Sequence, residues 1–343
     1  MWKQLKPKTE VEPLKVVRHI GFTYKDELFI QAGTTLKENL TLEPTDVLKI
    51  FNFKTNKWRL NYDVCNPKKR TGHSFVKFNN KIFIFGGTTG SRVYLNDLLE
   101  FDLETCLFSN EIHYYKGISD RFGQTSGLIN ESMIIFGGMF FSFQTLSWKY
   151  FNDFYEINLI TKEYKRIAFD KKSDEIEKIG AHASIENEKK NEIFIFGGLN
   201  SQGRSNKLYS LKKKDDEYIL KDLRPDGEIP CGRAGSAISI YLNQIFISGG
   251  YDGENALNDI YKYDIKSNFW IRIKYDLPYD IRLHSMSLRK FNEGFSLVIF
   301  GGVGKNDDEH HGEILELMID CDPFMKNLSQ NSNYLDIDII FKC

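Results

Sequence analysis

The chain has 343 residues and a formal net charge of −1, because 46 lysines and arginines stand against 47 aspartates and glutamates. This balance argues against a nucleic-acid-binding protein, which carries an excess of basic residues to attract phosphates. A hydrophobic fraction of 41% and a charged fraction of 27% are typical of a globular chain and not of a disordered one.

The sequence shows no targeting segment. No apolar run approaches the ~18 residues of a membrane span, and the N-terminal residues lack the apolar stretch of a signal peptide. The five cysteines are far apart and include no Cys-x-x-Cys pair, which argues against a disulfide scaffold or a zinc ribbon. We therefore expect a cytoplasmic protein with no nucleic-acid partner and no membrane association.

A short motif of apolar residues followed by two glycines recurs with a period of roughly 50 residues. After a degenerate first copy at 28–33, the copies occupy residues 82–87, 133–138, 193–198, 245–250 and 297–302. Each apolar run is expected to be a strand covered on both faces. The glycines allow a positive φ or the close approach of another segment. This assigns a structural role to Gly86, Gly87, Gly137, Gly138, Gly197, Gly198, Gly249, Gly250, Gly301 and Gly302.

Further positions recur around each motif in the same order. An Asn-Asp-type pair such as Asn96-Asp97 predicts a turn. An alternating segment, such as 98–103 in the second repeat, predicts a third strand. An aromatic residue, such as Trp270 in the fifth repeat, follows this strand after a turn and begins an outer strand. Each repeat is therefore expected to supply four strands, and an aromatic fraction of 14% favours an all-β class. A polar column precedes the apolar runs, at His19, His73, Gln124, His182, Ser236 and His284.

These co-registered columns resemble the kelch repeat from Trp2 to about residue 324, and the repeat length is that of the kelch family. The resemblance implies a six-bladed kelch β-propeller at residues 1–324, with four antiparallel strands per blade. Residues 325–343 are then a polar linker and a terminal strand. The last glycines of the six repeats stand at positions 33, 87, 138, 198, 250 and 302.

A propeller must close its ring, because its first and last blades otherwise expose sheet edges. The segment Trp2-Lys3-Gln4-Leu5 resembles the predicted outer strands, and we predict that it is the outer strand of blade six. The alternative is that Phe324 begins this strand, at residues 324–328.

Candidate catalytic and metal-binding residues are few. Motifs of serine hydrolases, P-loop proteins, zinc proteases and dinucleotide-binding folds are missing. The four histidines of the polar column offer a conceivable metal site, and the alternative is that each is hydrogen-bonded within its own blade. The segment 306–311 offers mixed ligands, and its alternative is a solvated acidic loop. We predict no enzyme activity, no metal and no cofactor; a kelch-type metalloenzyme and a cytoskeleton-associated structural protein are the other hypotheses.

Two sets of residues are candidates for binding a partner. Arginines at or close to one column before the first strand resemble those with which kelch adaptors hold acidic segments, and the fourth repeat has Ile179 there; they are Arg18, Arg70, Arg121, Arg233 and Arg282. The alternative is that they pack on aromatic rings or pair with an aspartate of a neighbouring blade. An aromatic loop at 139–151 supplies Phe140, Phe141, Phe143, Trp148 and Tyr150. Its alternative is to fold back over blade three or the channel.

The C-terminal segment 334–343 resembles the opening strand of a BTB domain. If a BTB domain follows in a longer form, the resemblance implies recruitment of a cullin ubiquitin ligase. The alternative is a strand that packs on the propeller. The sequence thus predicts a non-catalytic scaffold or substrate adaptor that binds a protein segment on the loop face of a kelch propeller.

Overall fold

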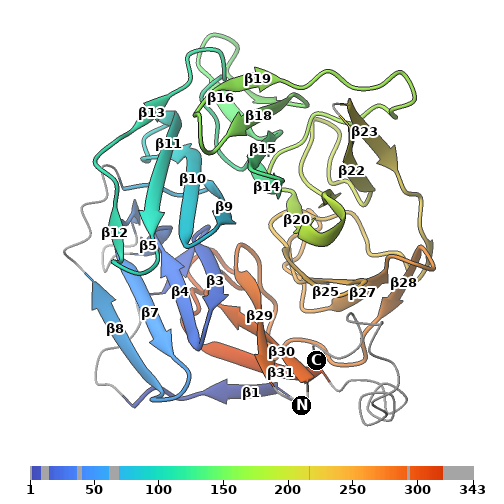
Figure 1. Ribbon diagram of the computed structural model, residues 1–343. Coiled ribbons are helices and arrows are strands. Elements are labelled where there is room, and N and C mark those ends of the chain that lie inside the picture. Colours follow the sequence, from blue (N-terminus) through green and yellow to red (C-terminus); the bar gives the residue numbers. More distant parts are fainter. Residues whose placement is uncertain are drawn as a thin grey trace, which may run out of the picture.

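A computed structural model describes residues 2–8, 15–36, 41–61, 69–215, 217–291 and 294–319. In this part of the chain the regular structure consists of strands, apart from one 3-10 turn, η1 (Glu188–Lys190). The predicted all-β class is therefore confirmed. The sheets are arranged around a common centre, with the first strand of each sheet nearest to it (Figure 1).

Six sheets share one plan, in which four strands pair antiparallel from the centre outward. The first three are β3 (Ile20–Tyr24), β4 (Glu27–Gln31), β7 (Leu48–Asn52) and β8 (Lys57–Asn61); β9 (Ser74–Phe78), β10 (Lys81–Thr88), β11 (Tyr94–Asp102) and β12 (Leu107–Phe108); and β14 (Thr125–Ile129), β15 (Ser132–Phe136), β18 (Phe154–Asn158) and β19 (Tyr164–Arg166). The others are β20 (Ala183–Asn187), β21 (Glu192–Phe196), β22 (Leu208–Lys214) and β23 (Glu217–Asp222); β25 (Ala237–Tyr241), β26 (Gln244–Ser248), β27 (Ile260–Asp264) and β28 (Phe269–Arg272); and β29 (Ser285–Phe291), β30 (Gly294–Phe300), β31 (Ile314–Ile319) and β1 (Trp2–Leu5).

The remaining strands belong to connections between these elements. The strands β2 (Val16–Val17), β5 (Thr34–Leu36) and β6 (Leu42–Pro44) form a three-stranded sheet. A separate two-stranded hairpin consists of β16 (Met139–Ser142) and β17 (Ser147–Tyr150). Two short strands extend larger sheets: β13 (His113–Tyr114) pairs with β11, and β24 (Asp226–Gly227) runs parallel to β28.

The hydrophobic core is divided into clusters that lie between neighbouring sheets. One cluster joins Phe29 of β4 to Ile84 of β10. Another joins Phe300 of β30 to Leu28 of β4 and Trp58 of β8, and so connects the last sheet with the first. Because both faces of the second strands are covered in this way, these strands are apolar without alternation.

A repeated backbone hydrogen bond connects each sheet to the next. The last glycine of each repeat motif donates its N–H to the carbonyl of the residue four positions before the next first strand. At Gly87 φ is 94°, and an added Cβ would lie 2.9 Å from both His73 Cβ and the Thr71 carbonyl oxygen. Glycine is required here by both conformation and space. The six links are Gly33–Arg70, Gly87–Arg121, Gly138–Ile179, Gly198–Arg233, Gly250–Ile281 and Gly302–Val16.

The N-terminal strand pairs with the last sheet, beside β31 (Figure 1). Trp2 lies opposite Leu317, and Leu5 opposite Ile314. The Trp2 indole Nε1 donates a hydrogen bond of 2.7 Å to the Asp276 carbonyl oxygen. The alternative strand at Phe324, like the polar tail at 325–343, lies outside the described residues.

The polar column connects neighbouring sheets, and the hypothesis of hydrogen bonds within each blade is wrong for its histidines. His182 Nε2 lies 2.7 Å from Thr125 Oγ1 of the preceding sheet. His284 Nε2 lies 2.8 Å from Ser248 Oγ, again of the preceding sheet. Burial lowers the pKa of both rings to about 3, so they are neutral at ordinary pH. The column therefore stabilises the contact between sheets.

Candidate partner-binding surface

The three arginines Arg70, Arg121 and Arg233 form a buried arginine layer. Their side chains are completely inaccessible to solvent. Arg70 donates two hydrogen bonds, of 2.9 and 3.0 Å, to the Asp97 carboxylate and a third, of 3.0 Å, to the Gly86 carbonyl oxygen. Each guanidinium thus ties the glycine bend of its sheet to the start of the third strand.

The other two members repeat this arrangement. Arg121 contacts both carboxylate oxygens of Asp153, and Arg233 contacts both of Asp259. In both cases Nη1 also donates to the carbonyl of the first glycine of the pair. Contrary to the prediction, these arginines are not part of an exposed partner-binding surface. Their aspartates belong to the same sheet and not to a neighbouring one.

A signal for this pairing is present in the sequence but was missed. In the strand register, Asp97, Asp153 and Asp259 each directly precede the residue of the third strand that pairs with the last residue before the glycines. The sheets that have Val16, Ile179 or Ile281 at the arginine position have Val47, Lys207 and Glu313 at the aspartate position. Arginine and aspartate therefore occur together at these two positions, as expected for a buried ion pair. Where the arginine is missing, the charged side chains of Lys207 and Glu313 stay partly exposed.

The loop face is the end of the sheets that carries the segments after the glycine pairs and the connections into the first strands. Arg18 and Arg282 lie on this face, outside the arginine layer. Arg18 is exposed, and its backbone N–H donates to the Leu283 carbonyl oxygen. Arg282 pairs with Asp307, whose side chain remains 87% exposed.

A third loop-face arginine, Arg204, was not predicted. The guanidinium carbons of Arg204 and Arg282 lie 5.1 and 4.8 Å from the centre of the Tyr251 ring. We call Arg18, Arg204 and Arg282 the arginine cluster. The sequence does not indicate this cluster, because Arg204 lies in a loop outside the repeated columns. Only folding brings Arg204 to the Tyr251 ring.

The predicted aromatic loop is the β16–β17 hairpin, and its base packs against the neighbouring sheet. Phe140 lies edge-to-face against Tyr94, with ring centres 6.3 Å apart. The Tyr94 hydroxyl accepts a hydrogen bond of 3.0 Å from the Phe141 N–H. The Arg92 guanidinium lies over the Phe141 ring at 4.1 Å. Phe140, Phe141 and Tyr150 are half-buried, so these predicted binding residues mainly hold the hairpin in place.

The outer part of the hairpin is exposed. Phe143 is 61% exposed, Leu146 75% and Trp148 45%, and Val93 of the neighbouring loop is 53% exposed. Arg92 also lies over the Phe143 ring, at 5.2 Å. We call Arg92, Val93, Phe143, Leu146 and Trp148 the hairpin patch. Large apolar side chains gathered at one exposed place are typical of an interaction surface.

The histidines of segment 306–311 are held by local contacts. His311 stacks on Tyr279, with ring centres 3.9 Å apart, and lies 3.6 Å from the Glu313 carboxylate. His310 Nε2 is hydrogen-bonded to the Asp307 carbonyl oxygen. Within the described ranges, no group of three or more His, Cys, Asp or Glu side chains is arranged to hold a metal ion.

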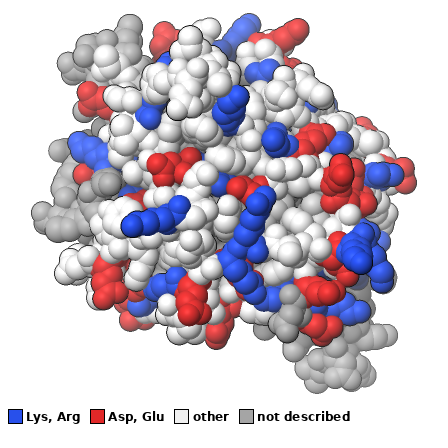
Figure 2. Space-filling model, turned by 90° about the horizontal axis from the view of Figure 1, so that it is seen from above, with Lys and Arg blue, Asp and Glu red and all other residues white. Residues whose placement is uncertain are grey.

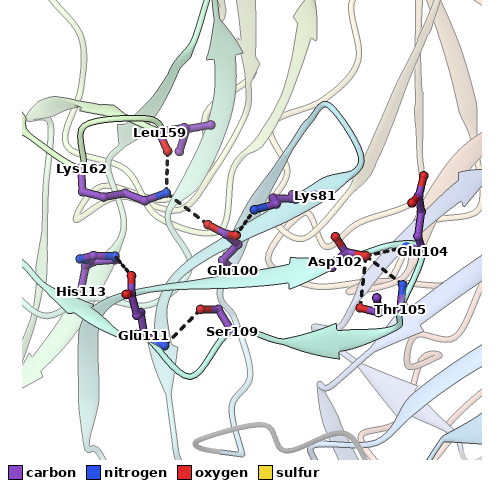
Figure 3. A network of polar contacts seen from close by, with 10 residues as sticks. All are labelled: Lys81, Glu100, Asp102, Glu104, Thr105, Ser109, Glu111, His113, Leu159 and Lys162. Carbon is purple, nitrogen blue, oxygen red and sulfur yellow. Dashed lines mark hydrogen bonds and ion pairs between the residues drawn. The ribbon is translucent and has the colours of Figure 1, made fainter.

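The opposite end of the sheets carries charges that neutralise one another. Glu100 of β11 pairs with Lys81 of β10 and, at 3.3 Å, with Lys162 beyond β18, so it links two sheets (Figure 3). Asp102 accepts hydrogen bonds from the N–H groups of Glu104 and Thr105 and so closes the turn after β11. On the side of the molecule seen in Figure 2, acidic and basic residues are interspersed. That side of the molecule shows no concentrated charge of one sign.

Comparison with known proteins gives two family matches. Residues 28–224 match the Attractin/LZTR1 beta-propeller model. Residues 169–326 match the model of the KLHDC2/KLHL20/DRC7 Kelch-repeats domain. Among described residues, the structure contains no helix with the length and apolarity needed to span a membrane.

Several curated proteins are similar over much of the chain. Human Kelch domain-containing protein 10 is 24% identical over 288 residues, which cover 78% of this chain and 60% of that protein. Human Leucine-zipper-like transcriptional regulator 1 is 23% identical over 246 residues, or 69% of this chain and 28% of that protein. The chain thus spans at most about 60% of the length of these relatives.

Proposed function

This chain belongs to the kelch-repeat β-propeller family, whose members generally serve as protein-interaction modules, and we propose that it is a non-catalytic scaffold or substrate adaptor that binds a partner segment on its loop face. The observation that carries the proposal is the hairpin patch. A solvated hairpin has no need of three large exposed apolar side chains, whereas interaction hot spots are enriched in aromatic residues and arginine.

The proposed architecture is a six-bladed propeller closed by β1. Three observations support it: six sheets of one plan, the pairing of β1 with β31, and the Gly302–Val16 link that joins the last repeat to the first. Deletion of residues 2–5 removes this closing strand together with the partly buried Trp2 side chain. We expect a loss of about 2 kcal/mol in the free energy of unfolding, measured with urea. An unchanged midpoint would contradict closure by β1.

The arginine cluster is the second part of the proposed site. The guanidinium groups of Arg204 and Arg282 lie over Tyr251, and the backbone of Arg18 is hydrogen-bonded to Leu283, the residue after Arg282. Among described residues, the ion pairs of the three arginines are limited to the one between Arg282 and Asp307. Arginine presents a planar set of donors to carboxylates. The cluster therefore suits an acidic part of the partner, while the hairpin patch suits an apolar part.

An affinity-capture experiment tests the proposal. Wild-type protein and a Phe143→Ala/Leu146→Ala/Trp148→Ala variant serve as baits in a cell extract. The matched control is Ile160→Ala/Phe269→Ala, whose two side chains are 60% and 41% exposed but lie at the other end of the sheets. We expect the hairpin variant alone to lose specific partners while its thermal unfolding is unchanged. Equal capture by all three proteins would contradict the proposed site.

We also propose that the protein acts in the cytoplasm. A cullin ubiquitin ligase is a proposed partner only for a longer form that contains a BTB domain, since the segment 334–343 lies outside the described residues. Fractionation of cells that express the tagged chain tests the location, and capture of a cullin by the longer form tests this partner.

A further inference from the structure

The β16–β17 hairpin has one edge that is covered and one that is open. On the covered edge, Met139 exchanges two backbone hydrogen bonds with Phe122, of 2.9 and 3.1 Å, and the Phe141 N–H donates to the Tyr94 hydroxyl. Met139 and Phe141 therefore direct their backbone polar groups away from β17. The covered edge of β16 is therefore hydrogen-bonded to Phe122, which precedes β14, and to Tyr94 of the neighbouring sheet.

The strand register then determines which groups lie on the open edge. Phe140 lies opposite Lys149, and Ser142 opposite Ser147. Because backbone groups alternate along an antiparallel strand, these are the hydrogen-bonded pairs. Trp148 consequently directs its N–H and C=O outward, as does Tyr150. None of the described residues forms a hydrogen bond with these four backbone groups.

Both faces of β17 are accessible near this edge. Trp148 and Lys149 are neighbours in a strand, so their side chains point to opposite faces, and both are exposed. An open edge with free N–H and C=O groups is a template for pairing with another strand. A hairpin of two strands also gains stability from a third.

We propose that β17 receives an extended segment of a partner protein as a third strand, and that this segment alternates apolar and acidic side chains. The proposal rests on the proposed binding function and names the partner's chemistry. On one face, the apolar side chains of the segment lie beside Trp148 and Phe141. On the other face, its acidic side chains lie beside Lys149.

Charge complementarity supports this choice of partner. Among described residues, no carboxylate lies within ion-pair distance of Lys149 or Arg92. Opposite charges on adjacent strands stabilise a pair, and like charges destabilise it. A second copy of this chain is a poorer occupant, because antiparallel pairing of two β17 strands brings two Lys149 side chains onto one face. An acidic segment avoids this repulsion.

The test uses the full chain and the synthetic peptide acetyl-Val-Glu-Val-Glu-Val-Glu-amide. Backbone amide exchange is followed by NMR, with Lys149 as the internal reference because its N–H points toward β16. We expect saturating peptide to slow exchange of the Trp148 and Tyr150 amides about tenfold or more, with little change at Lys149. Exchange of Trp148 and Tyr150 at the free rate in the bound state would overturn strand addition.

Two N-methylated peptides provide a matched pair. A residue directly opposite Trp148 shares its face, so the valines of the peptide direct their N–H groups toward β17 and the glutamates direct theirs away. Methylation of the valine nitrogens is expected to abolish binding, and methylation of the glutamate nitrogens to preserve it. Equal effects of the two modifications would overturn the proposed register.

Charge reversal tests the acidic specificity. In Lys149→Glu we expect the Val-Glu peptide to bind about two- to fivefold more weakly and the corresponding Val-Lys peptide to bind more tightly. No change would overturn the acidic class of partner. Protection of Trp148 and Tyr150 that rises with protein concentration in the absence of peptide would identify a second copy as the occupant and would overturn the proposal.

These outcomes separate strand addition from the broader binding function. If the hairpin variant loses its partners while the peptide leaves the Trp148 and Tyr150 amides unprotected, the side-chain surface remains and only strand addition fails. If the hairpin variant captures the same partners as wild-type protein, the proposed function fails whatever the amides show.

Discussion

Arg70 of the arginine layer and Arg282 of the arginine cluster stand at nearly the same position of the sequence repeat but in opposite environments. Arg70 is buried and bound to both oxygens of Asp97. Arg282 is near the surface, and the aspartate that it contacts is largely exposed. The same residue type therefore serves stability in one place and remains accessible to a ligand in the other. What differs is the partner: a buried aspartate near the start of the third strand, or an exposed aspartate on a loop.

Removal of a buried arginine should have the largest effect. Arg70→Ala leaves the Asp97 carboxylate buried without its partner, so we expect a loss of about 3–5 kcal/mol in the free energy of unfolding. Urea titration measures it. The double variant Arg70→Met/Asp97→Leu removes both charges and should be more stable than the single variant. A single-variant cost below about 1 kcal/mol would show that the layer is not held by these pairs.

A change in the hairpin patch should affect binding without affecting stability. Truncation of an aromatic hot spot costs about 2 kcal/mol or more in binding free energy, so Trp148→Ala is expected to weaken partner binding about 30-fold. Its urea midpoint should stay close to that of the wild type, because the side chain is 45% exposed. Calorimetric titration with a captured partner gives the affinity. Unfolding at a lower urea concentration would place Trp148 among the structural residues instead.

The buried histidines of the polar column should make the free energy of unfolding depend on pH. The pKa of His182 is lowered to about 3 by burial, whereas the ordinary value is 6.5, so the unfolded chain binds a proton that the folded chain excludes. The stability from this neutral ring is complete above about pH 6.5 and is lost as the pH falls toward 3. His182→Gln should lower the slope of stability against pH between 6 and 5 by up to about 1.4 kcal/mol per pH unit. Urea unfolding at these pH values measures the slope, and an identical slope in the variant would contradict this origin.

Removal of a loop-face arginine should have the smallest effect on stability. Arg282→Ala breaks an ion pair with a largely exposed carboxylate, so we expect a change below about 1 kcal/mol. Thermal unfolding measures it. The same variant should bind an acidic partner more weakly, and a large loss of stability would remove the distinction between layer and cluster.

Much of the fold could be predicted because each repeat contains short local patterns that indicate its strands and turns. The apolar runs, the glycines and the aromatic outer strands each need only a few neighbouring residues to indicate a strand, a bend or a turn. The pairing of Trp2-Leu5 with the last sheet could also be predicted, because its sequence is similar to that of other outer strands. The candidate site was predicted less well. The hairpin was found from its aromatic content, but Phe140 and Phe141 mostly contact Tyr94 and Arg92 of another repeat.

The amino-acid sequence alone determined the all-β class and the repeats, because strand propensity and glycine conformation act over a few residues. Only the tertiary structure decided which arginines are buried, which aromatic rings face solvent, and that Arg204 lies beside Tyr251. These properties depend on contacts between repeats about 50 residues apart, and burial is defined by the neighbours that folding supplies.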